Sequence, residues 1–186
     1  ADLAGARLDY FVTVSGTGGT VSGVRRVLRK ERPNTKIILS EPANAALVSR
    51  GHAQERSASN SPAVSHPHWE PHPIQGWTPD FIPYVLQEAI DGAYYDELIP
   101  VAGADGIKWA KELAAKEGIL TGVSGGSTLA IAMQIAEKAP EGSVICCMLP
   151  DTGERYLSTP LFDGIEEDMD ADEIAISQST PGYQMG

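Results

Sequence analysis

Apolar residues follow two alternating patterns along this chain of 186 residues. Short apolar or β-branched runs are typical of buried strands, and stretches in which apolar residues recur every three to four positions are typical of helices. The runs predict strands at residues 10–14, 36–40, 98–101, 119–123 and 144–149, and the stretches predict helices between residue 21 and Pro33 and at 83–90, 105–117 and 127–139. This order is typical of a sheet covered on both faces, so we expect a three-layer α/β fold with a mainly parallel sheet.

Two segments fall outside this alternation. Residues 49–80 hold all four histidines with several prolines and serines, so we expect an irregular loop that either binds a ligand or is mobile. Residues 163–186 hold a run of acids with no Lys or Arg among them, namely Asp163, Glu166, Glu167, Asp168, Asp170, Asp172 and Glu173. Because these acids supply most of the net charge of −11, we divide the chain into a domain at 1–162 and a solvated acidic tail at 163–186.

Hydropathy and charge exclude two classes of partner. No apolar stretch approaches the roughly 18 residues that a membrane span needs. The basic residues gather on the polar side of one predicted helix, so we expect no nucleic acid partner.

The only cysteines, Cys146 and Cys147, are neighbours in a predicted strand. We therefore expect reduced core thiols in an intracellular protein, located in the cytoplasm or in a plastid or other organelle.

The turn Ser15-Gly16-Thr17-Gly18-Gly19-Thr20 lies between the first predicted strand and the first predicted helix. Glycines let backbone N–H groups point at an anion, and the start of a helix adds amides and a positive dipole, so the turn predicts a phosphate-binding loop. A tight turn without a ligand is the simpler alternative. A dinucleotide site would use Glu41 at the end of the second strand, but its motif needs Gly or Ala where this chain has Val21. A Walker loop is excluded because no Gly-Lys-Ser/Thr follows.

A second strand-to-helix connection, Gly122-Val123-Ser124-Gly125-Gly126-Ser127-Thr128, is expected at the same edge of the sheet. Its serines could contact a ligand, cap the helix, or do both. A third polar segment, Gly153-Glu154-Arg155-Tyr156-Leu157-Ser158-Thr159, follows the last strand. We expect Asp151, Glu154 and Arg155 to form an ion-pair group that fixes this segment, and we assign none of them a catalytic role.

The histidines of the long loop are candidates for metal ligands. His66, His68 and His72 could approach a metal ion, with Glu70 as an oxygen ligand. Their spacing is not that of a known closed site, and the prolines between them oppose convergence on one point. We therefore predict no metal site.

Four motifs follow one another over residues 8–162, and their order is informative. They are Gly16-Thr17-Gly18-Gly19-Thr20, then His72-Pro73-Ile74-Gln75-Gly76 with Phe81-Ile82-Pro83, then Gly122-Val123-Ser124-Gly125-Gly126, then the run from Gly153 to Thr159. Together they resemble the C-terminal half of cysteine synthase, also called O-acetylserine sulfhydrylase. The resemblance implies the larger C-terminal domain of a fold type II enzyme, usually a homodimer, that makes cysteine from O-acetylserine and sulfide by β-replacement with pyridoxal 5′-phosphate (PLP).

The resemblance also assigns roles to individual residues. Gly16, Thr17, Gly18, Gly19 and Thr20 would bind the cofactor phosphate, and Ser124 would form a hydrogen bond with the pyridine nitrogen. A hydroxyl stabilises a protonated ring nitrogen less than a carboxylate does, which suits elimination of a β-substituent. Gly76 and Trp77 would line the substrate entrance.

The chain also departs from the pattern of that family. The family's Schiff-base lysine lies in the N-terminal half, and none of the lysines here, which are Lys30, Lys36, Lys108, Lys111, Lys116 and Lys138, occupies a comparable position. We therefore expect a fragment that is inactive alone and name no catalytic residue. Trp77-Thr78-Pro79-Asp80 also replaces a glycine-rich Ile-Gly-Ala-Gly stretch of many relatives.

Two alternative functions remain open at this stage. Gly125-Gly126-Ser127-Thr128 is closer to the version of that turn in cystathionine β-synthase, which also catalyses β-replacement. A non-catalytic module is the other alternative, because members of the cysteine synthase family bind the C-terminal tail of serine acetyltransferase at the mouth of the active site.

Overall fold

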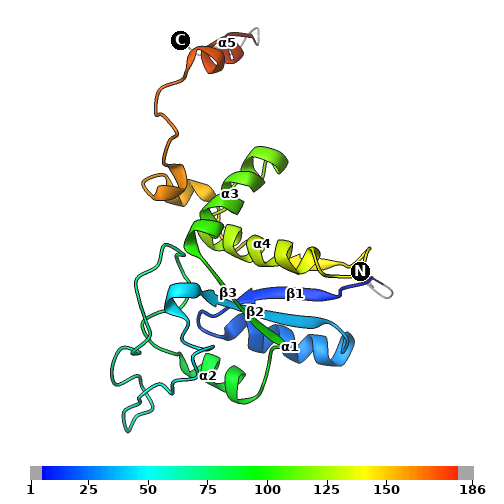
Figure 1. Ribbon diagram of the computed structural model, residues 1–186, viewed down its shortest axis with the longest axis vertical. Helices are drawn as coiled ribbons and strands as arrows, with labels where there is room; N and C mark the ends of the chain where they lie inside the picture. The colour runs from blue at the N-terminus through cyan, green and yellow to red at the C-terminus, as the bar shows by residue number, and fades with distance from the viewer. Residues whose placement is uncertain (1–5, 180–186) are drawn as a thin grey trace.

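A four-stranded parallel sheet forms the centre of the computed structural model, which describes residues 6–179 (Figure 1). Its strands are β1 (Tyr10–Val14), β2 (Lys36–Pro42), β3 (Glu97–Val101) and β4 (Ile145–Cys147), in the spatial order β3-β2-β1-β4. β1 pairs with β2 from Tyr10 opposite Lys36 to Val14 opposite Ser40. All pairings are parallel, so the ends of β1 and β2 meet at one edge of the sheet.

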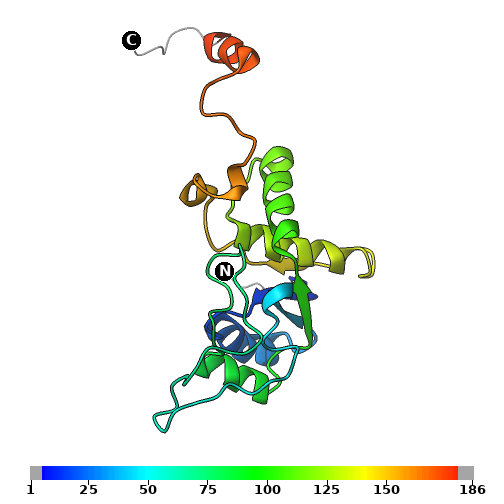
Figure 2. The same cartoon turned by 60° about the vertical axis from the view of Figure 1, so that its left-hand side comes forward.

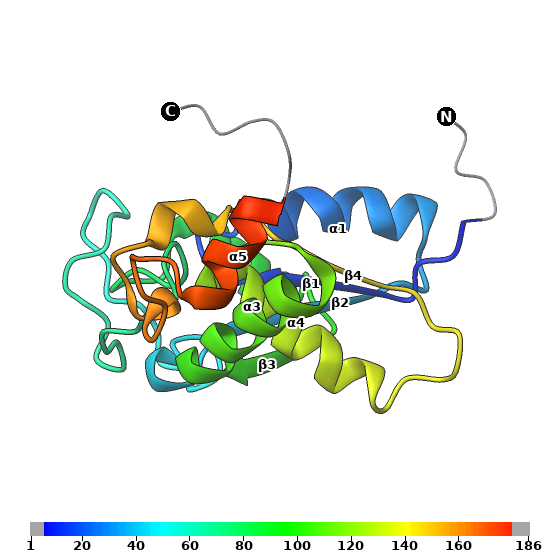
Figure 3. The ribbon, with the colours of Figure 1, turned by 90° about the horizontal axis from the view of Figure 1, so that it is seen from above.

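Helices cover both faces of this sheet. α1 (Gly19–Glu31) and α2 (Tyr84–Asp91) pack on one face, and α3 (Gly103–Glu117) and α4 (Val123–Ala136) lie on the other side, as the view along the sheet shows (Figure 3). Successive strand residues point to opposite faces. Phe11 and Ile37 accordingly belong to the core beneath α1, and Val12 and Ile38 to the core beneath α4. The three-layer α/β prediction is confirmed.

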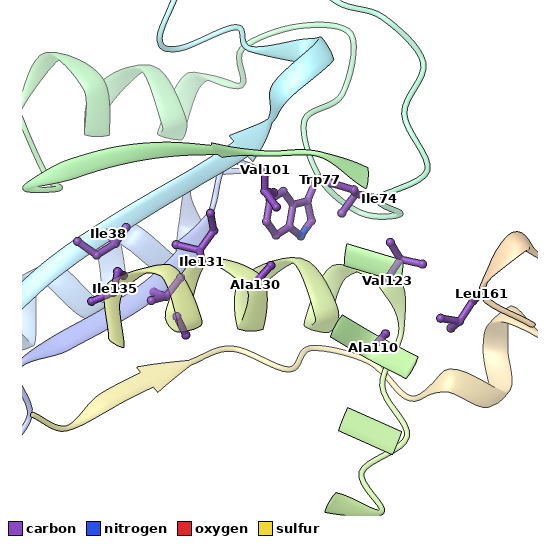
Figure 4. Close-up of a cluster of buried hydrophobic side chains, with 12 residues drawn as sticks. Ile38, Ile74, Trp77, Val101, Ala110, Val123, Ala130, Ile131, Ile135 and Leu161 are labelled. Atoms are coloured by element: carbon purple, nitrogen blue, oxygen red, sulfur yellow. The ribbon is translucent and has the colours of Figure 1, made fainter. Parts of the chain in front are cut away.

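Helix α4 is buried along most of its length, as its nearly continuous apolar sequence predicts. Ala130, Ile131 and Ile135 face Ile38 and the rest of the sheet (Figure 4). On its other side α4 contacts α3 closely, because Gly126 has no side chain. A Cβ there would lie 2.7 Å from the backbone nitrogen of Ala110.

The prediction of a strand at residues 119–123 is wrong. Ile119 and Leu120 are exposed, Thr121 forms a single antiparallel bridge with Thr152, and α4 already begins at Val123. The apolar run looked like a buried strand because periodicity cannot distinguish a short strand from the buried start of a helix. The glycines that follow belong to the helix, where they allow close packing.

The prediction for residues 144–149 is only partly right. A strand forms only at Ile145–Cys147, and within the described chain it lies at an edge of the sheet beside β1. Ile145 and Cys147 pack against the core under α4, while Cys146 points the other way and is exposed. The expectation of two core thiols is therefore wrong for Cys146.

The long loop at residues 49–80 has no helix or strand, as predicted, and hydrogen bonds join its parts. Gln54 is buried and holds it together, because its amide donates to the carbonyl of Val64 at 2.9 Å and its Oε1 accepts from the N–H of Ile82 at 2.9 Å. No helix within residues 6–179 has the length and apolar character needed to cross a membrane.

Residues 163–179 of the acidic tail extend away from the body of the molecule (Figure 2). This segment contains a helix, α5 (Ala171–Ser179), in which every side chain is exposed. The short 3-10 turns η2 (Gly153–Tyr156) and η3 (Pro160–Phe162) precede it, and η1 (Ala43–Ala45) follows β2. The proposed boundary at residue 162 stays a prediction.

Candidate functional site

The glycine turn forms an anion-binding geometry where β1 ends. Gly18 is the residue before α1 and has a φ of 89°, and Gly19 begins the helix. The N–H groups of Gly16, Thr17 and Gly18 donate to no acceptor within residues 6–179, while the N–H of Gly19 donates to Thr17 Oγ1 at 3.3 Å. Free amides at the start of a helix bind phosphate well.

One of these glycines is required by its surroundings, and a second has a close backbone neighbour. Gly18 has a left-handed backbone, and a Cβ there would overlap the backbone of Leu86 and lie 2.8 Å from the carbonyl carbon of Val85. Gly16 faces the carbonyl of Gly76, which a Cβ would approach to 3.3 Å. The turn is thus held between the first turn of α2 and the segment around Gly76.

A pocket of about 200 Å³ opens beside this turn. Its walls come from four parts of the chain, and the lining residues are Val14, Gln75, Gly76, Trp77, Ser124, Pro150, Asp151 and Tyr156. The structure therefore brings Gly76, Trp77 and Ser124 together at the carboxyl end of the sheet, next to the glycine turn. Val14 ends the strand that leads into the glycine turn, and it lines the same pocket as Ser124. This confirms the expectation that residues 122–128 lie at the same edge of the sheet as the glycine turn.

Ser124 lies in the first turn of α4 and is 3% exposed. The residue before the helix is Gly122, and no side chain caps the helix. Ser127 donates to the carbonyl of Val123 at 2.8 Å, four residues back, so the alternative that a serine caps this helix is wrong. Within the described chain the Ser124 hydroxyl has no protein partner, which leaves it available to a ligand.

Trp77 is a wall of this pocket and not part of an open entrance. Its side chain is 5% exposed and packs with Ile74 and Val101 in the core under α4 (Figure 4). Its indole N–H is buried and has no partner in the described chain. A buried donor of this kind normally forms a hydrogen bond with an acceptor in the protein, in water or in a ligand. Gly76, by contrast, is exposed at the rim.

The segment after β4 contributes the carboxylate of Asp151 to the pocket, in addition to the ion pair expected for this residue. Asp151 does pair with Arg155, at 2.9 Å from its Nε. Asp151 also accepts from the Tyr156 hydroxyl at 2.6 Å, a bond that lowers the pKa of Asp151 and raises the pKa of Tyr156. Glu154 is exposed and does not join this pair.

The histidines of the long loop do not converge as metal ligands. His66 and His68 lie near His52, with ring centroids about 5.5 Å apart, whereas the Nε2 of His72 donates to the carbonyl of Thr78 at 3.1 Å. In residues 6–179 no group of three or more His, Cys, Asp or Glu side chains could hold a metal ion. Burial, together with the Arg50 guanidinium, lowers the pKa of His68.

These features fit a planar heteroaromatic ring that carries a phosphate. Free amides of the glycine turn suit the phosphate, while the unpaired Ser124 hydroxyl suits a polar atom of a ring in the adjacent pocket. Val14, Trp77 and Pro150 are the apolar residues of the pocket lining, and such residues suit the face of a ring.

Comparisons with known proteins point in the same direction. The profile of the family described as "Pyridoxal-phosphate dependent enzyme" matches residues 1–151. An O-ureido-L-serine synthase from Streptomyces lavendulae is 46% identical over 170 residues, which are 91% of this chain and 46% of that protein. A cysteine synthase from Staphylococcus aureus strain Mu50 is 37% identical over 158 residues, which are 85% of this chain and 44% of that protein.

A solved structure is similar over the same length. The crystal structure of an O-ureido-L-serine synthase superimposes with a TM-score of 0.76 at 45% identity, and covers 94% of this chain and 49% of that one. The chain therefore spans about half the length of the curated relatives it matches.

Proposed function

The chain belongs to the family of pyridoxal-phosphate-dependent enzymes, and from this we propose that it is the cofactor-binding part of an enzyme that replaces the β-substituent of a serine derivative. The observation that carries the proposal is the position of Ser124. Its free hydroxyl lines a pocket beside the glycine turn, in which the amides of Gly16, Thr17 and Gly18 are free. A ring nitrogen and a phosphate on one small molecule would satisfy both.

Each part of the site then has a chemical role. When bound, PLP supplies a ring that accepts electrons from the carbon atoms of an amino acid. The amides from Gly16 to Thr20 would bind its phosphate and fix its position. Ser124 would hold the ring nitrogen through a neutral hydrogen bond, which favours loss of a β-substituent over chemistry that needs a protonated ring. Val14 and Trp77 would exclude water from the ring.

The two relatives differ in the product that their names give, and so in the nucleophile that would replace the substituent. Cysteine formation from O-acetylserine and sulfide is the reaction that the sequence motifs predict. The identity to an O-ureido-L-serine synthase is higher, 46% against 37%, and covers more of this chain. This observation favours a nucleophile with a ureido group as the second candidate. The cystathionine β-synthase alternative depends on Gly125-Gly126-Ser127-Thr128 at the start of α4, and it stays a prediction.

Further expectations belong to the whole enzyme. A Schiff-base lysine supplied by another stretch of chain, a homodimeric state, a cytoplasmic location and docking of a serine acetyltransferase tail all stay predictions. The pocket beside Gly76 is where such a tail would have to approach.

Binding of pyridoxamine 5′-phosphate tests the proposal on this chain alone. This probe has the ring and phosphate of PLP but no aldehyde, so its binding does not require a lysine. Calorimetry should detect binding of this probe, and pyridoxamine without the phosphate should bind much more weakly. Ser124→Ala should weaken binding about fivefold, the effect of one neutral hydrogen bond. Ser127→Ala is the matched control on the same helix and should leave the affinity unchanged.

A competition assay separates the candidate nucleophiles. The chain would be fused to the N-terminal half of the Streptomyces relative and given O-acetylserine with sulfide, homocysteine or hydroxyurea, the last being the free compound that corresponds to the ureido group. The product formed fastest identifies the nucleophile. No probe binding in the previous experiment would defeat the cofactor role itself.

A further inference from the structure

Thr78 forms hydrogen bonds with Ser15, the first residue of the glycine turn. The backbone N–H and the hydroxyl of Thr78 both donate to the carbonyl oxygen of Ser15, each at 2.8 Å. The two hydroxyls also lie 2.7 Å apart, so Ser15 Oγ donates to Thr78 Oγ1 in return. Both side chains are buried, with 0% and 3% of their surfaces exposed. This pair therefore joins segments that are 63 residues apart in the sequence.

The other side of Thr78 is bonded to the long loop. Its carbonyl oxygen accepts from the indole N–H of Trp69 and from Nε2 of His72, both at 3.1 Å. Its φ is 26°, a value that costs energy for a β-branched residue. The surrounding hydrogen bonds hold Thr78 in this conformation, so the residue is fixed from both sides.

Both neighbours of the pair belong to the candidate site. Ser15 is followed by Gly16, the first glycine of the turn, and Thr78 is preceded by Trp77, which lines the ring pocket. Gly16 in turn faces the carbonyl of Gly76. Any shift between Ser15 and Thr78 would therefore change the spacing between the phosphate loop and the pocket wall.

We propose that Ser15 and Thr78 are a positioning pair, which sets the distance between the phosphate loop and the wall of the ring pocket. This inference rests on the proposed cofactor site but assigns residues that touch neither the phosphate nor the ring. The hydroxyl is the essential group, because it both donates to the Ser15 carbonyl and accepts from the Ser15 hydroxyl. Serine can make the same bonds at position 78, whereas valine has the shape of threonine and can make neither.

Affinity for pyridoxamine 5′-phosphate tests the pair in the 186-residue chain. Thr78→Val should weaken binding about tenfold, and Thr78→Ser should stay within about twofold of the unchanged chain, because only the first loses the hydroxyl. Thr13→Val is the matched control. Thr13 is equally buried on β1, but its hydroxyl has no partner within the described residues, so the same chemical change should leave affinity unaltered.

A double variant separates positioning from stability. Thr78→Val alone leaves the Ser15 hydroxyl buried without its acceptor, so it lowers stability as well as affinity. Ser15→Ala with Thr78→Val removes both hydroxyls and should recover part of the lost resistance to urea, since no lone polar side chain remains. Its affinity for the probe should stay about tenfold weak, because the hydroxyl bonds between positions 15 and 78 are still absent and only the backbone bond remains.

The indole resonance of Trp69 reports the geometry directly. In a ¹H–¹⁵N spectrum this signal should move in Thr78→Val and not in Thr78→Ser, because the indole donates to the Thr78 carbonyl. Wild-type affinity in the folded double variant would overturn the positioning role while leaving the proposed function intact. If the unchanged chain failed to bind the probe, the proposed function would fail first and the pair would have nothing to position.

Discussion

Gly18→Ala is the substitution whose effect the structure specifies most sharply. A side chain at position 18 meets two separate penalties. The left-handed backbone, with φ at 89°, costs alanine roughly 1–2 kcal/mol more than glycine. The new Cβ also overlaps the backbone of Leu86 at the start of α2, and relief of such overpacking costs a further 1–3 kcal/mol or so. The expected loss in free energy of unfolding is therefore roughly 2–5 kcal/mol.

Urea denaturation followed by circular dichroism measures this loss. Gly23→Ala is the matched control, because Gly23 lies within α1 and a Cβ there meets nothing within 4 Å. That control should gain roughly 0.5–1 kcal/mol, the helix preference of alanine over glycine. A Gly18→Ala protein as stable as the unchanged chain would refute the reasoning, since neither penalty would then exist. Affinity for pyridoxamine 5′-phosphate should fall in the same variant, because relief of the overlap moves the phosphate loop.

Three further predictions concern residues outside the candidate site. Burial opposes ionisation of Asp96, but the amide of Ile37 and the guanidinium of Arg29 outweigh it and lower the pKa of Asp96 below 3.8. Its stabilising effect is thus complete above that value and lost as the pH falls through the lower folded pKa, so Asp96→Asn should flatten the acid limb of a stability-against-pH curve. Iodoacetamide should modify the exposed Cys146 of the native chain before Cys147, whose pKa is raised by burial, as mass spectrometry of digested protein would reveal. Glu41→Gln should cost about 1–3 kcal/mol in urea denaturation, because the fully buried carboxylate accepts from two backbone N–H groups; an unchanged midpoint would argue against that role.

The sequence predicts much of the fold because its local signals agree with one another. Residues 10–42 combine a β-branched run, a glycine turn and a helix with a clear apolar side, and the structure places β1, α1 and β2 there. Residues 119–128 mislead because Gly125 and Gly126 suggest a loop. Their absent side chains instead serve packing, since a Cβ on Gly125 would overlap Thr121 and one on Gly126 would overlap α3. Such a requirement comes from a neighbouring element and leaves no local signal.

In the candidate site, too, the features with a local sequence signal could be predicted, and those that depend on distant contacts could not. The glycine turn and Ser124 could be found because both are recognisable motifs at the ends of predicted elements. The bonds of Thr78 to Ser15 could not, because no local pattern pairs a loop residue with a turn 63 positions away. The burial of Trp77 was missed for a related reason. A tryptophan in a polar, proline-rich stretch suggests an exposed position, and only the folded loop carries it into the core.

The close approach of α3 and α4 has a consequence for how the pocket beside the glycine turn could change. Ala110 of α3 packs directly on Gly126, two residues along the helix from Ser124. Enlarging Ala110 would push the start of α4 and carry the Ser124 hydroxyl with it. Variation in the sequence of α3, which contributes no residue to the pocket beside the glycine turn, can therefore shift the Ser124 hydroxyl within that pocket. In a library screened for new substrates, useful substitutions should appear on α3 as well as around the pocket.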